Sequence, residues 1–267
     1  MEAAPRSGNI HVGVGGWDYD PWRGTFFPAG LPKTKQLEYA ASQLTATEIN
    51  ATYYKLQKPE LFERWAKAVP DGFRFAVKAS RFCTNRKVLG DGGEGVERFC
   101  AQGIVELGDK LGPILWQFMG TKRFEPDDFQ AFLKLLPDKQ DGVKLRHAIE
   151  PRHESFRTPQ FVAMARAAGV GIVFADADDY PCIPDLSGDF AYARLQRCRE
   201  SEATGYDAAA LDRWAAAARA WARGESPQGF PYAAEAAAPR PRDSYVFFIS
   251  GAKVRAPLAA RALIERL

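Results

Sequence analysis

Eight short apolar runs recur along this chain, and nearly all of them end in a polar or charged residue. A charged group inside a core is costly unless it is paired and hydrogen-bonded. The polar residues at or beside the run ends are Glu48, Lys78, Gln117, Glu150, Asp176 and Arg194. In an eight-stranded β/α barrel the carboxyl ends of the strands converge on one face, where they build the active site. The pattern therefore predicts that fold and the place of a site within it.

Strand-like and helix-like segments alternate along the chain. The apolar runs are rich in Val, Ile, Phe and Tyr, as strands prefer, and we predict strands over residues 10–16, 46–52, 73–79, 113–118, 145–152, 171–176, 190–195 and 245–250. We predict helices over residues 34–44, 59–69, 95–110, 126–136, 159–168, 207–223 and 253–267. Only the sixth crossover, residues 177–189, is short and proline-bound, so its helix is missing or a single turn. The alternation predicts a closed parallel eight-stranded β/α (TIM) barrel, with an open doubly wound sheet as the alternative.

Size and composition agree with this architecture. The 267 residues match one barrel, which typically needs about 250, so we expect a single domain over residues 1–267. With 46% hydrophobic and 26% charged residues, the composition is that of an ordinary folded protein. The net charge is +3, and the 36 Lys and Arg are spread among 33 Asp and Glu. A nucleic-acid partner is therefore an alternative that composition does not favour.

Cellular context follows from the cysteines and from the apolar stretches. The four cysteines form no Cys-x-x-Cys pair, so we expect reduced thiols. The start of the chain lacks the pattern of a secretory signal, and no apolar stretch approaches the roughly 20 residues that span a bilayer. We expect a cytoplasmic protein without a membrane partner.

Side chains alternate across a strand, so residues two apart share a face. In five of the predicted strands a small or apolar residue precedes polar ones on the same face: Ala76 with Lys78, Leu115 with Gln117, Ala148 with Glu150 and Arg152, Phe174 with Asp176, and Tyr192 with Arg194. In a sixth strand, Glu48 and Asn50 share a face. This pattern predicts a packed barrel interior beneath a polar mouth. For any single residue, a structural ion pair explains the charge equally well.

The charged residues suggest specific chemical roles. We predict that Glu48 and Glu150 form a general acid/base pair. Lys78 is a candidate base or Schiff-base nucleophile, and a plain salt bridge to either glutamate is the alternative. Arg152 and Arg194 are predicted to clamp an anion, because a guanidinium matches carboxylate and phosphate geometry.

The remaining candidates are substrate-binding residues. Asn50, Gln117 and Asp176 complete the polar set at the strand ends. Trp17 begins an aromatic loop, whose other rings are Tyr19, Trp22, Phe26 and Phe27. We expect these rings to form a plug of core aromatics, and the alternative is a platform on which a base or sugar stacks.

The sequence requires no cofactor. A magnesium or manganese site formed by Glu48, Glu150 and Asp176 is a weak alternative. His11 and His147 lie at the wrong end or on the wrong face of their strands, so a zinc site is not expected.

The chain resembles the YecE-like proteins, a TIM-barrel family of unknown function. The matching segments cover almost the whole chain, and they include Val14-Gly15-Gly16-Trp17, Glu48-Ile49-Asn50-Ala51-Thr52-Tyr53-Tyr54, Phe73-Arg74-Phe75-Ala76-Val77-Lys78, Leu111-Gly112-Pro113-Ile114-Leu115-Trp116-Gln117, Ala148-Ile149-Glu150-Pro151-Arg152-His153, Ala175-Asp176 and Tyr192-Ala193-Arg194-Leu195. The resemblance implies the barrel and the strand-end positions, and it implies no reaction. This chain departs from the family pattern at Asn85, at Gln196-Arg197 and at Ser250, where a histidine, a His-Gly pair and an Asn-rich strand end are usual.

The leading hypothesis is an enzyme that uses acid/base chemistry on a small polar substrate, anionic or sugar-like. The alternative is a non-catalytic barrel that binds a phosphorylated ligand or a nucleic-acid end at the same mouth. No residue pattern distinguishes hydrolysis from isomerisation or aldol-type cleavage, and none indicates an oligomeric state.

Overall fold

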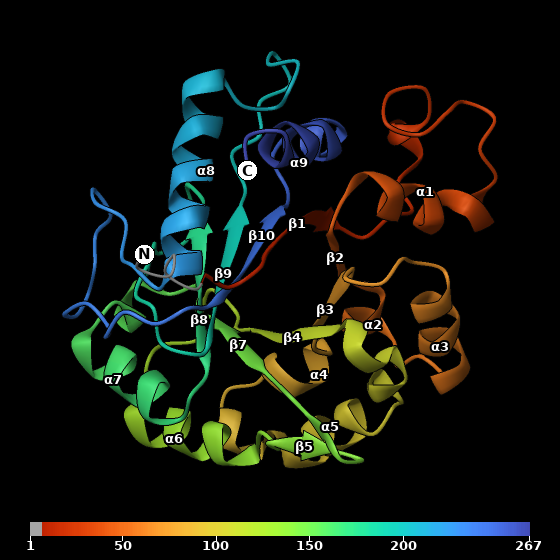
Figure 1. Cartoon of the computed structure of the whole chain (residues 1–267). Helices are drawn as coiled ribbons and strands as arrows, with labels where there is room; N and C mark the ends of the chain where they lie inside the picture. The colour runs from red at the N-terminus through yellow and green to blue at the C-terminus, as the bar shows by residue number, and fades with distance from the viewer. Residues whose placement is uncertain (1–6) are drawn as a thin grey trace, which may run out of the picture.

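Eight parallel strands close into a barrel in the computed structural model, which describes residues 7–267 (Figure 1). The barrel strands are β1 (Ile10–Gly15), β2 (Ala46–Ile49), β3 (Arg74–Lys78), β4 (Leu111–Gln117), β7 (His147–Glu150), β8 (Gly171–Asp176), β9 (Phe190–Leu195) and β10 (Asp243–Phe248). They neighbour one another in the order β1-β10-β9-β8-β7-β4-β3-β2, and β1 pairs with both β10 and β2. The predicted closed barrel is confirmed, and the open sheet is excluded.

Helices lie around the outside of the barrel (Figure 1). The α-helices are α1 (Gln36–Gln43), α2 (Ala51–Tyr54), α3 (Pro59–Lys67), α4 (Arg81–Thr84), α5 (Gly93–Cys100), α6 (Pro126–Leu135), α7 (Pro159–Ala167), α8 (Ala208–Arg223) and α9 (Ala256–Ile264). Short 3₁₀ turns are η1 (Asp20–Trp22), η2 (Lys33–Lys35), η3 (Leu89–Gly92), η4 (Ile104–Lys110), η5 (Glu154–Phe156) and η6 (Lys253–Arg255), and a small hairpin joins β5 (Lys139–Gln140) to β6 (Val143–Lys144). Residues 177–189, all of them described, contain no helix, as the sequence predicts for the sixth crossover.

The helix expected over residues 95–110 is wrong as a single element. The structure ends α5 at Cys100 and resumes with the 3₁₀ turn η4 at Ile104. Gly103 lies between them in a left-handed conformation with φ +101, which glycine adopts at low cost and which interrupts the helix.

Helix α8 shows how local signals place an outer helix. Asp207 caps it, because its carboxylate accepts a hydrogen bond from the Ala210 amide at 2.8 Å, and Gly224 ends it with φ +80. The buried face of α8 includes Trp221, whose ring lies 5.6 Å from that of Phe174 on β8. Aromatic packing therefore holds α8 against the outside of the barrel.

The barrel interior is filled by pairing small side chains with large rings. The interior residues below the mouth are Ala46, Ala76, Leu115, Ala148, Val173, Phe190, Tyr192, Tyr245 and Phe247. Three alanines on β2, β3 and β7 leave space that the rings from β9 and β10 occupy. The interior is therefore filled by side chains, and within the barrel the space for a ligand lies above it, at the strand ends.

Strand β8 corrects one predicted face. Val173 points into the barrel, whereas Phe174 packs outward against Trp214 and Trp221. Alternation then places Asp176 on the outer face with Phe174, so its predicted position inside the mouth is wrong. The run from Gly171 is apolar throughout, as in strands buried on both faces, and it carries no alternation from which the faces could be assigned.

The glycines of β1 permit a close approach between strands. A Cβ atom on Gly13 would lie 1.9 Å from the Ala46 carbonyl oxygen, and one on Gly15 would lie 2.9 Å from Ile249 Cδ1. Any side chain at Gly13 or Gly15 would therefore push these neighbouring segments apart.

Other expectations concern the thiols, the membrane and the start of the chain. All four cysteines are free thiols. Within residues 7–267, no helix has the length and apolar character to cross a bilayer. The prediction that the start of the chain carries no secretory signal concerns mainly residues 1–6, which lie outside the described part of the chain.

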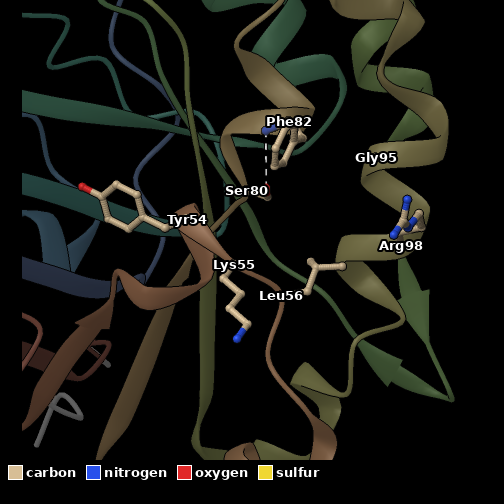
Figure 2. Close-up of a pocket in the computed structure, with 7 residues that line it drawn as sticks. All are labelled: Tyr54, Lys55, Leu56, Ser80, Phe82, Gly95 and Arg98. Carbon is tan, nitrogen blue, oxygen red and sulfur yellow. Dashed lines mark hydrogen bonds between the residues drawn. The ribbon is translucent and has the colours of Figure 1, made fainter.

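A groove of about 430 Å³ lies outside the barrel beside the strand ends (Figure 2). It is formed by α2, the residues that follow it, α4 and α5, and its aromatic walls are Tyr54 and Phe82, each 65% exposed. Lys55 and Arg98 also line it. Tyr54 lines a cavity in the barrel mouth as well, so the groove and the mouth adjoin.

Candidate functional site

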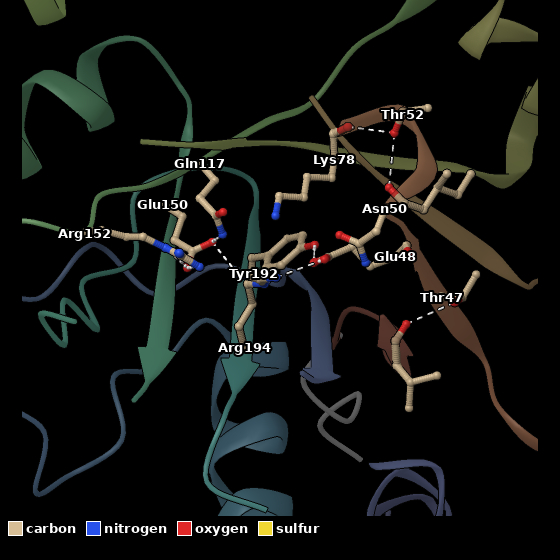
Figure 3. Close-up of polar contacts among 12 residues, drawn as sticks. Thr47, Glu48, Asn50, Thr52, Lys78, Gln117, Glu150, Arg152, Tyr192 and Arg194 are labelled. Atoms are coloured by element: carbon tan, nitrogen blue, oxygen red, sulfur yellow. Dashed lines mark hydrogen bonds and ion pairs between the residues drawn. The ribbon is translucent and has the colours of Figure 1, made fainter. Parts of the chain in front are cut away.

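The barrel mouth brings together most of the predicted residues. Glu48, Lys78, Gln117, Glu150, Arg152 and Arg194 project from the carboxyl ends of five strands into one polar cluster, shown in Figure 3. Register explains the meeting, because Gln117 pairs with Glu150 across β4 and β7. The predicted inner faces of β2, β3, β4, β7 and β9 are thus confirmed.

Arg194 is the centre of this cluster. Its Nη1 donates to Glu150 Oε2 at 2.6 Å, while Nε and Nη2 donate to the two carboxylate oxygens of Glu48 at 3.2 and 3.1 Å. Both glutamates are 0% exposed and Arg194 is 2% exposed. A guanidinium has five N–H donors, so two remain for a ligand once these three hydrogen bonds are made.

Glu150 has all of its acceptor capacity in use. Oε2 accepts from Arg194 and from Gln117 Nε2 at 2.7 Å, and Oε1 accepts from Arg152 Nε and Nη2, both at 3.3 Å. Burial raises the pKa of this carboxyl, but Arg194 and then Arg152 outweigh burial and hold the pKa below its ordinary value. Glu150 is therefore ionised at neutral pH.

Glu48 is held in a similar way. Its Oε2 also accepts a hydrogen bond from the Tyr192 hydroxyl at 2.7 Å. Tyr192 is a buried residue of β9, and burial followed by the neighbouring Glu48 charge raises its pKa well above the ordinary value. The Tyr192 hydroxyl therefore stays protonated at neutral pH and donates a hydrogen bond to Glu48. We had not predicted a role for Tyr192, although it shares the inner face with Arg194.

Lys78 differs from the other charged groups because it has no carboxylate partner. Among residues 7–267, no acidic oxygen lies within ion-pairing distance of Lys78 Nζ, so the alternative of a plain salt bridge to Glu48 or Glu150 is wrong. The ammonium lies 4.1 Å from the centroid of the Tyr53 ring and is directed toward the middle of the cluster (Figure 3). Burial, followed by the charge of Arg194, lowers the pKa of Lys78 from 10.5 to about 8.

A cavity of about 480 Å³ opens above this cluster. Four cationic side chains line it, and they are Lys78, Arg152, Arg194 and Lys253. Within the described chain, no acidic residue lines this cavity, since Glu48 and Glu150 lie beneath the arginines. Ligand-facing charge is therefore positive, although the chain as a whole is nearly neutral.

Arg152 and Lys253 form two walls of the cavity. Tyr180, from the crossover that lacks a helix, lies with its ring 4.1 Å from the Arg152 guanidinium and accepts a hydrogen bond from Nη1 at 3.1 Å. Lys253 Nζ lies 4.4 Å from the Tyr19 ring, and burial lowers the pKa of Lys253. Lys253 and Tyr180 lie in segments beyond strand ends, where no strand pattern pointed to them.

Asn50 and Trp17 lie beside the cluster. The side chain of Asn50 lines the cavity, and its Nδ2 donates to the Glu48 carbonyl oxygen at 3.3 Å. Trp17 packs edge-on against Trp65, with ring centroids 5.2 Å apart, and lines a smaller adjoining hollow of about 280 Å³. Its role in substrate binding stays a prediction.

The aromatic loop behaves mainly as the predicted plug. Trp22, Phe26 and Phe27 are 0%, 3% and 1% exposed, and their rings pack on one another and on Tyr39. These buried rings are unavailable for stacking on a ligand, so the plug is confirmed for this part of the loop.

The weak alternative of a metal site is wrong. Asp176 lies on the outer face of β8, where its Oδ1 is 3.5 Å from Arg197 Nη1. Burial raises the pKa of Asp176, and Arg197 offsets part of that rise. Among residues 7–267, no three His, Cys, Asp or Glu side chains are grouped as metal ligands. Glu48 and Glu150 are also already occupied by donors.

Three residues that differ from the family pattern, Ser250, Asn85 and Gln196, lie at different distances from the cavity. Ser250 lines the cavity and adopts φ +64. The Asn85 Nδ2 group lies 3.4 Å from the Tyr53 hydroxyl, one side chain removed from Lys78. The Nε2 group of Gln196 is buried without a partner among the described residues.

These observations define a TIM-barrel protein with an arginine-centred polar cluster at the carboxyl ends of its strands. The chain belongs to the family described as "Protein of unknown function DUF72", whose profile matches residues 11–267.

Relatives agree with this assignment. The chain is 30% identical over 142 residues to the UPF0759 protein YecE of Escherichia coli (strain K12), a match that covers 52% of this chain and 48% of that protein. The match thus spans about half the length of that relative. A DUF72 family protein from Thermotoga maritima superposes with a TM-score of 0.75 at 22% identity, covering 96% of this chain and 98% of that one. A second, from Enterococcus faecalis, has a TM-score of 0.67 at 17% identity over 99% and 100% of the two chains. At these identities the structural matches establish the fold alone.

Proposed function

We propose that this protein is an enzyme that binds a small anionic substrate in the barrel mouth and moves a proton on it with Lys78. The observation that carries the proposal is the cavity of about 480 Å³, which is lined by four cations and, within the described chain, by no carboxylate. A small cavity with converging positive groups favours an anion over a neutral sugar.

The charge balance of the cluster supports anion binding. Three cations, Lys78, Arg152 and Arg194, meet two carboxylates, Glu48 and Glu150, so the set carries a net charge of +1 while Lys78 is protonated. The unused N–H groups of the two arginines supply fixed donors for a carboxylate or phosphate group. The glutamates orient those arginines, and in this role they need not touch the substrate.

Lys78 is best suited to proton transfer among the groups that line the cavity. A general acid or base works best when its pKa lies near the working pH, and the pKa of Lys78 is about 8. The glutamate pair, which we predicted for this role, is held by strong donors on nearly every carboxylate lone pair. We therefore assign the glutamates to positioning and Lys78 to chemistry.

Solvent exchange tests this proposal without a known product. Pyruvate, dihydroxyacetone phosphate and malate each carry an anionic group and an acidic or activated C–H, and proton NMR in D₂O follows loss of that hydrogen. We expect the wild-type protein to accelerate exchange in at least one of the three, and Lys78→Met to remove the acceleration. The exposed Lys58→Met is the matched control, and we expect it to behave as wild type. No acceleration by the wild-type protein, or equal acceleration by Lys78→Met, would count against the assignment.

A second candidate function rests on the groove beside the mouth. Tyr54 and Phe82 are exposed rings that line the groove together with Lys55 and Arg98 (Figure 2). Aromatic rings and cations along one groove are typical of single-stranded nucleic-acid sites. In this version a terminal phosphate occupies the mouth, and bases stack along the groove.

Fluorescence anisotropy with a labelled six-nucleotide single strand separates the two functions. Binding that falls steeply with salt and weakens in Phe82→Ala would support the second candidate. Val88→Ala is the control, because Val88 is also an exposed apolar residue, at 44%, and does not line the groove. Absence of binding at low salt would exclude it.

A further inference from the structure

Lys78 has the features of an amine that can attack a carbonyl group. It sits at the end of β3 with its Nζ directed into the cavity, and no described carboxylate pairs with it (Figure 3). A lysine becomes nucleophilic when burial and neighbouring cations favour its neutral form. Both causes are present, since burial comes first and Arg194 second among the effects that lower its pKa.

Each element around Lys78 contributes a defined group. Arg194 on β9 and Arg152 beyond β7 favour loss of its proton, while Glu48 and Glu150 oppose it. The Tyr53 ring on α2 holds the ammonium from one side at 4.1 Å. The Lys78 carbonyl oxygen also accepts a hydrogen bond from the Thr52 hydroxyl at 2.7 Å, which fixes the strand end. The strand end is therefore fixed, and the amine lies against the Tyr53 ring at the edge of the cavity.

We propose that Lys78 forms a Schiff base with an aldehyde or ketone that also carries a carboxylate or phosphate group. This inference rests on the proposed anion-binding function and adds the carbonyl class of the substrate. The neutral amine adds to the carbonyl carbon, and both amine hydrogens then leave with the carbonyl oxygen as one water. A C=N bond replaces the C=O bond, so the step needs no oxidant or reductant. Arg152 and Arg194 hold the anionic group while this occurs.

The expected selectivity follows from the fraction of neutral amine. With a pKa of about 8, roughly one Lys78 in ten is unprotonated at pH 7, which is roughly 300-fold more than for a lysine at 10.5. A less basic amine is also a weaker nucleophile, so the gain in trapping rate is smaller than this ratio. We expect Lys78 to be trapped about tenfold or more faster than the exposed Lys58.

Reductive trapping tests the inference directly. The protein is incubated at pH 7 with cyanoborohydride and with glyoxylate, glyceraldehyde 3-phosphate or neutral glyceraldehyde, and modified lysines are located by peptide mass spectrometry. Glyoxylate carries a carboxylate and glyceraldehyde 3-phosphate carries a phosphate, so these two probes distinguish the anionic groups. Glyceraldehyde is the matched control that lacks the phosphate. We expect Lys78 to be labelled first by at least one anionic probe, and much more slowly by glyceraldehyde. Inorganic phosphate should protect it.

Two variants separate the interpretations. Lys78→Arg keeps the positive charge and cannot form an imine, so it should still bind phosphate but lose the fast labelling. Lys58→Arg alters an exposed lysine outside the cavity and should leave the label on Lys78. Labelling that follows exposure alone, or that falls first on Lys253, would overturn the inference. If phosphate still binds while no fast label forms, the Schiff base fails and the anion site stands. If phosphate does not bind either, the proposed function fails with it.

Discussion

Replacing Arg194 with methionine isolates the energetic role of the cluster. Arg194→Met retains most of the side-chain volume but removes the guanidinium that bridges Glu48 and Glu150. Glu150 keeps Arg152 and Gln117, whereas Glu48 keeps only the Tyr192 hydroxyl. Most of the cost therefore falls on Glu48, which becomes a buried carboxylate with one neutral donor.

The expected loss in unfolding free energy is about 3–5 kcal/mol, the range found when one partner of a buried ion pair is removed. For a domain of this size, that corresponds to a melting temperature lower by roughly 10 °C. Urea unfolding at pH 7.5 measures the loss. Arg157→Met is the control, since Arg157 is 41% exposed and its ion pair with Glu154, which is 66% exposed, lies at the surface. We expect it to cost about 1 kcal/mol or less.

The pH dependence gives a sharper test of the same reasoning. In the wild type the pKa of Glu150 is lowered, so its stabilisation is present above the unfolded-state value of 4.5 and is lost as pH falls through the folded-state pKa. Arg194 is the largest effect that opposes burial at Glu150, so without it we expect the pKa of Glu150 to rise. As the pH falls, protonation of the buried carboxyl removes its unfavourable charge in the variant. The difference in unfolding free energy between wild type and variant should therefore shrink from pH 7.5 to pH 5. Adding Glu48→Gln to Arg194→Met should recover part of the loss. A penalty below about 1 kcal/mol, or one that grows on acidification, would refute this account.

Three further predictions concern other parts of the structure. Lys78 has a lowered pKa, so the unfolded state binds its proton more tightly between about pH 8 and 10.5, and the contribution of this residue to stability rises with pH over that window. Urea titrations should show a more positive slope of unfolding free energy against pH in the wild type than in Lys78→Met, and equal slopes would contradict the assignment. Gly13→Ala places a Cβ atom 1.9 Å from the Ala46 carbonyl oxygen and should lower the unfolding free energy by about 3 kcal/mol or more, measured by urea unfolding. Gly30→Ala enters open space and should be nearly neutral in the same assay, so equal losses in the two variants would contradict the packing argument. Asp176→Asn should leave phosphate affinity unchanged by calorimetry, because Asp176 faces Arg197 outside the mouth; a loss of affinity would restore it to the site.

The fold was largely predictable because polar residues end strands whose other inner residues are small or apolar. On β2, β3 and β7 an alanine precedes the charge by two positions, which identifies the inner face. The same reasoning gives the wrong face for β8. This strand is apolar on both faces, and its last residue, Asp176, lies on the outer face. The break at Gly103 was missed because glycine within an apolar helical pattern does not by itself reveal a left-handed turn.

The sequence predicts which residues meet at the barrel mouth better than it predicts their contacts and chemical roles. Position at a strand end identifies Glu48 and Glu150 as candidates. The hydrogen bonds from Arg194 to both carboxylates are seen only in the three-dimensional structure. Lys253 follows the last strand in a short turn, and no periodicity marks it as a cavity residue. The sequence also does not show that Lys78 lacks a carboxylate partner. The distances from Lys78 to Glu48 and Glu150 are set by the packing of separate strands.

The most direct test of the anion-binding claim is the thermal shift caused by inorganic phosphate in the wild type and in Arg152→Ala. Arg152 is a suitable choice because it lines the cavity while its side chain keeps 20% exposure, so the variant should fold. At phosphate concentrations near one hundred times the dissociation constant, binding stabilises the folded state by about 2.7 kcal/mol. We predict a clear rise in the wild-type melting temperature that is absent or much smaller in Arg152→Ala. No shift in the wild type, or an equal shift in both proteins, would contradict an anion site at the barrel mouth.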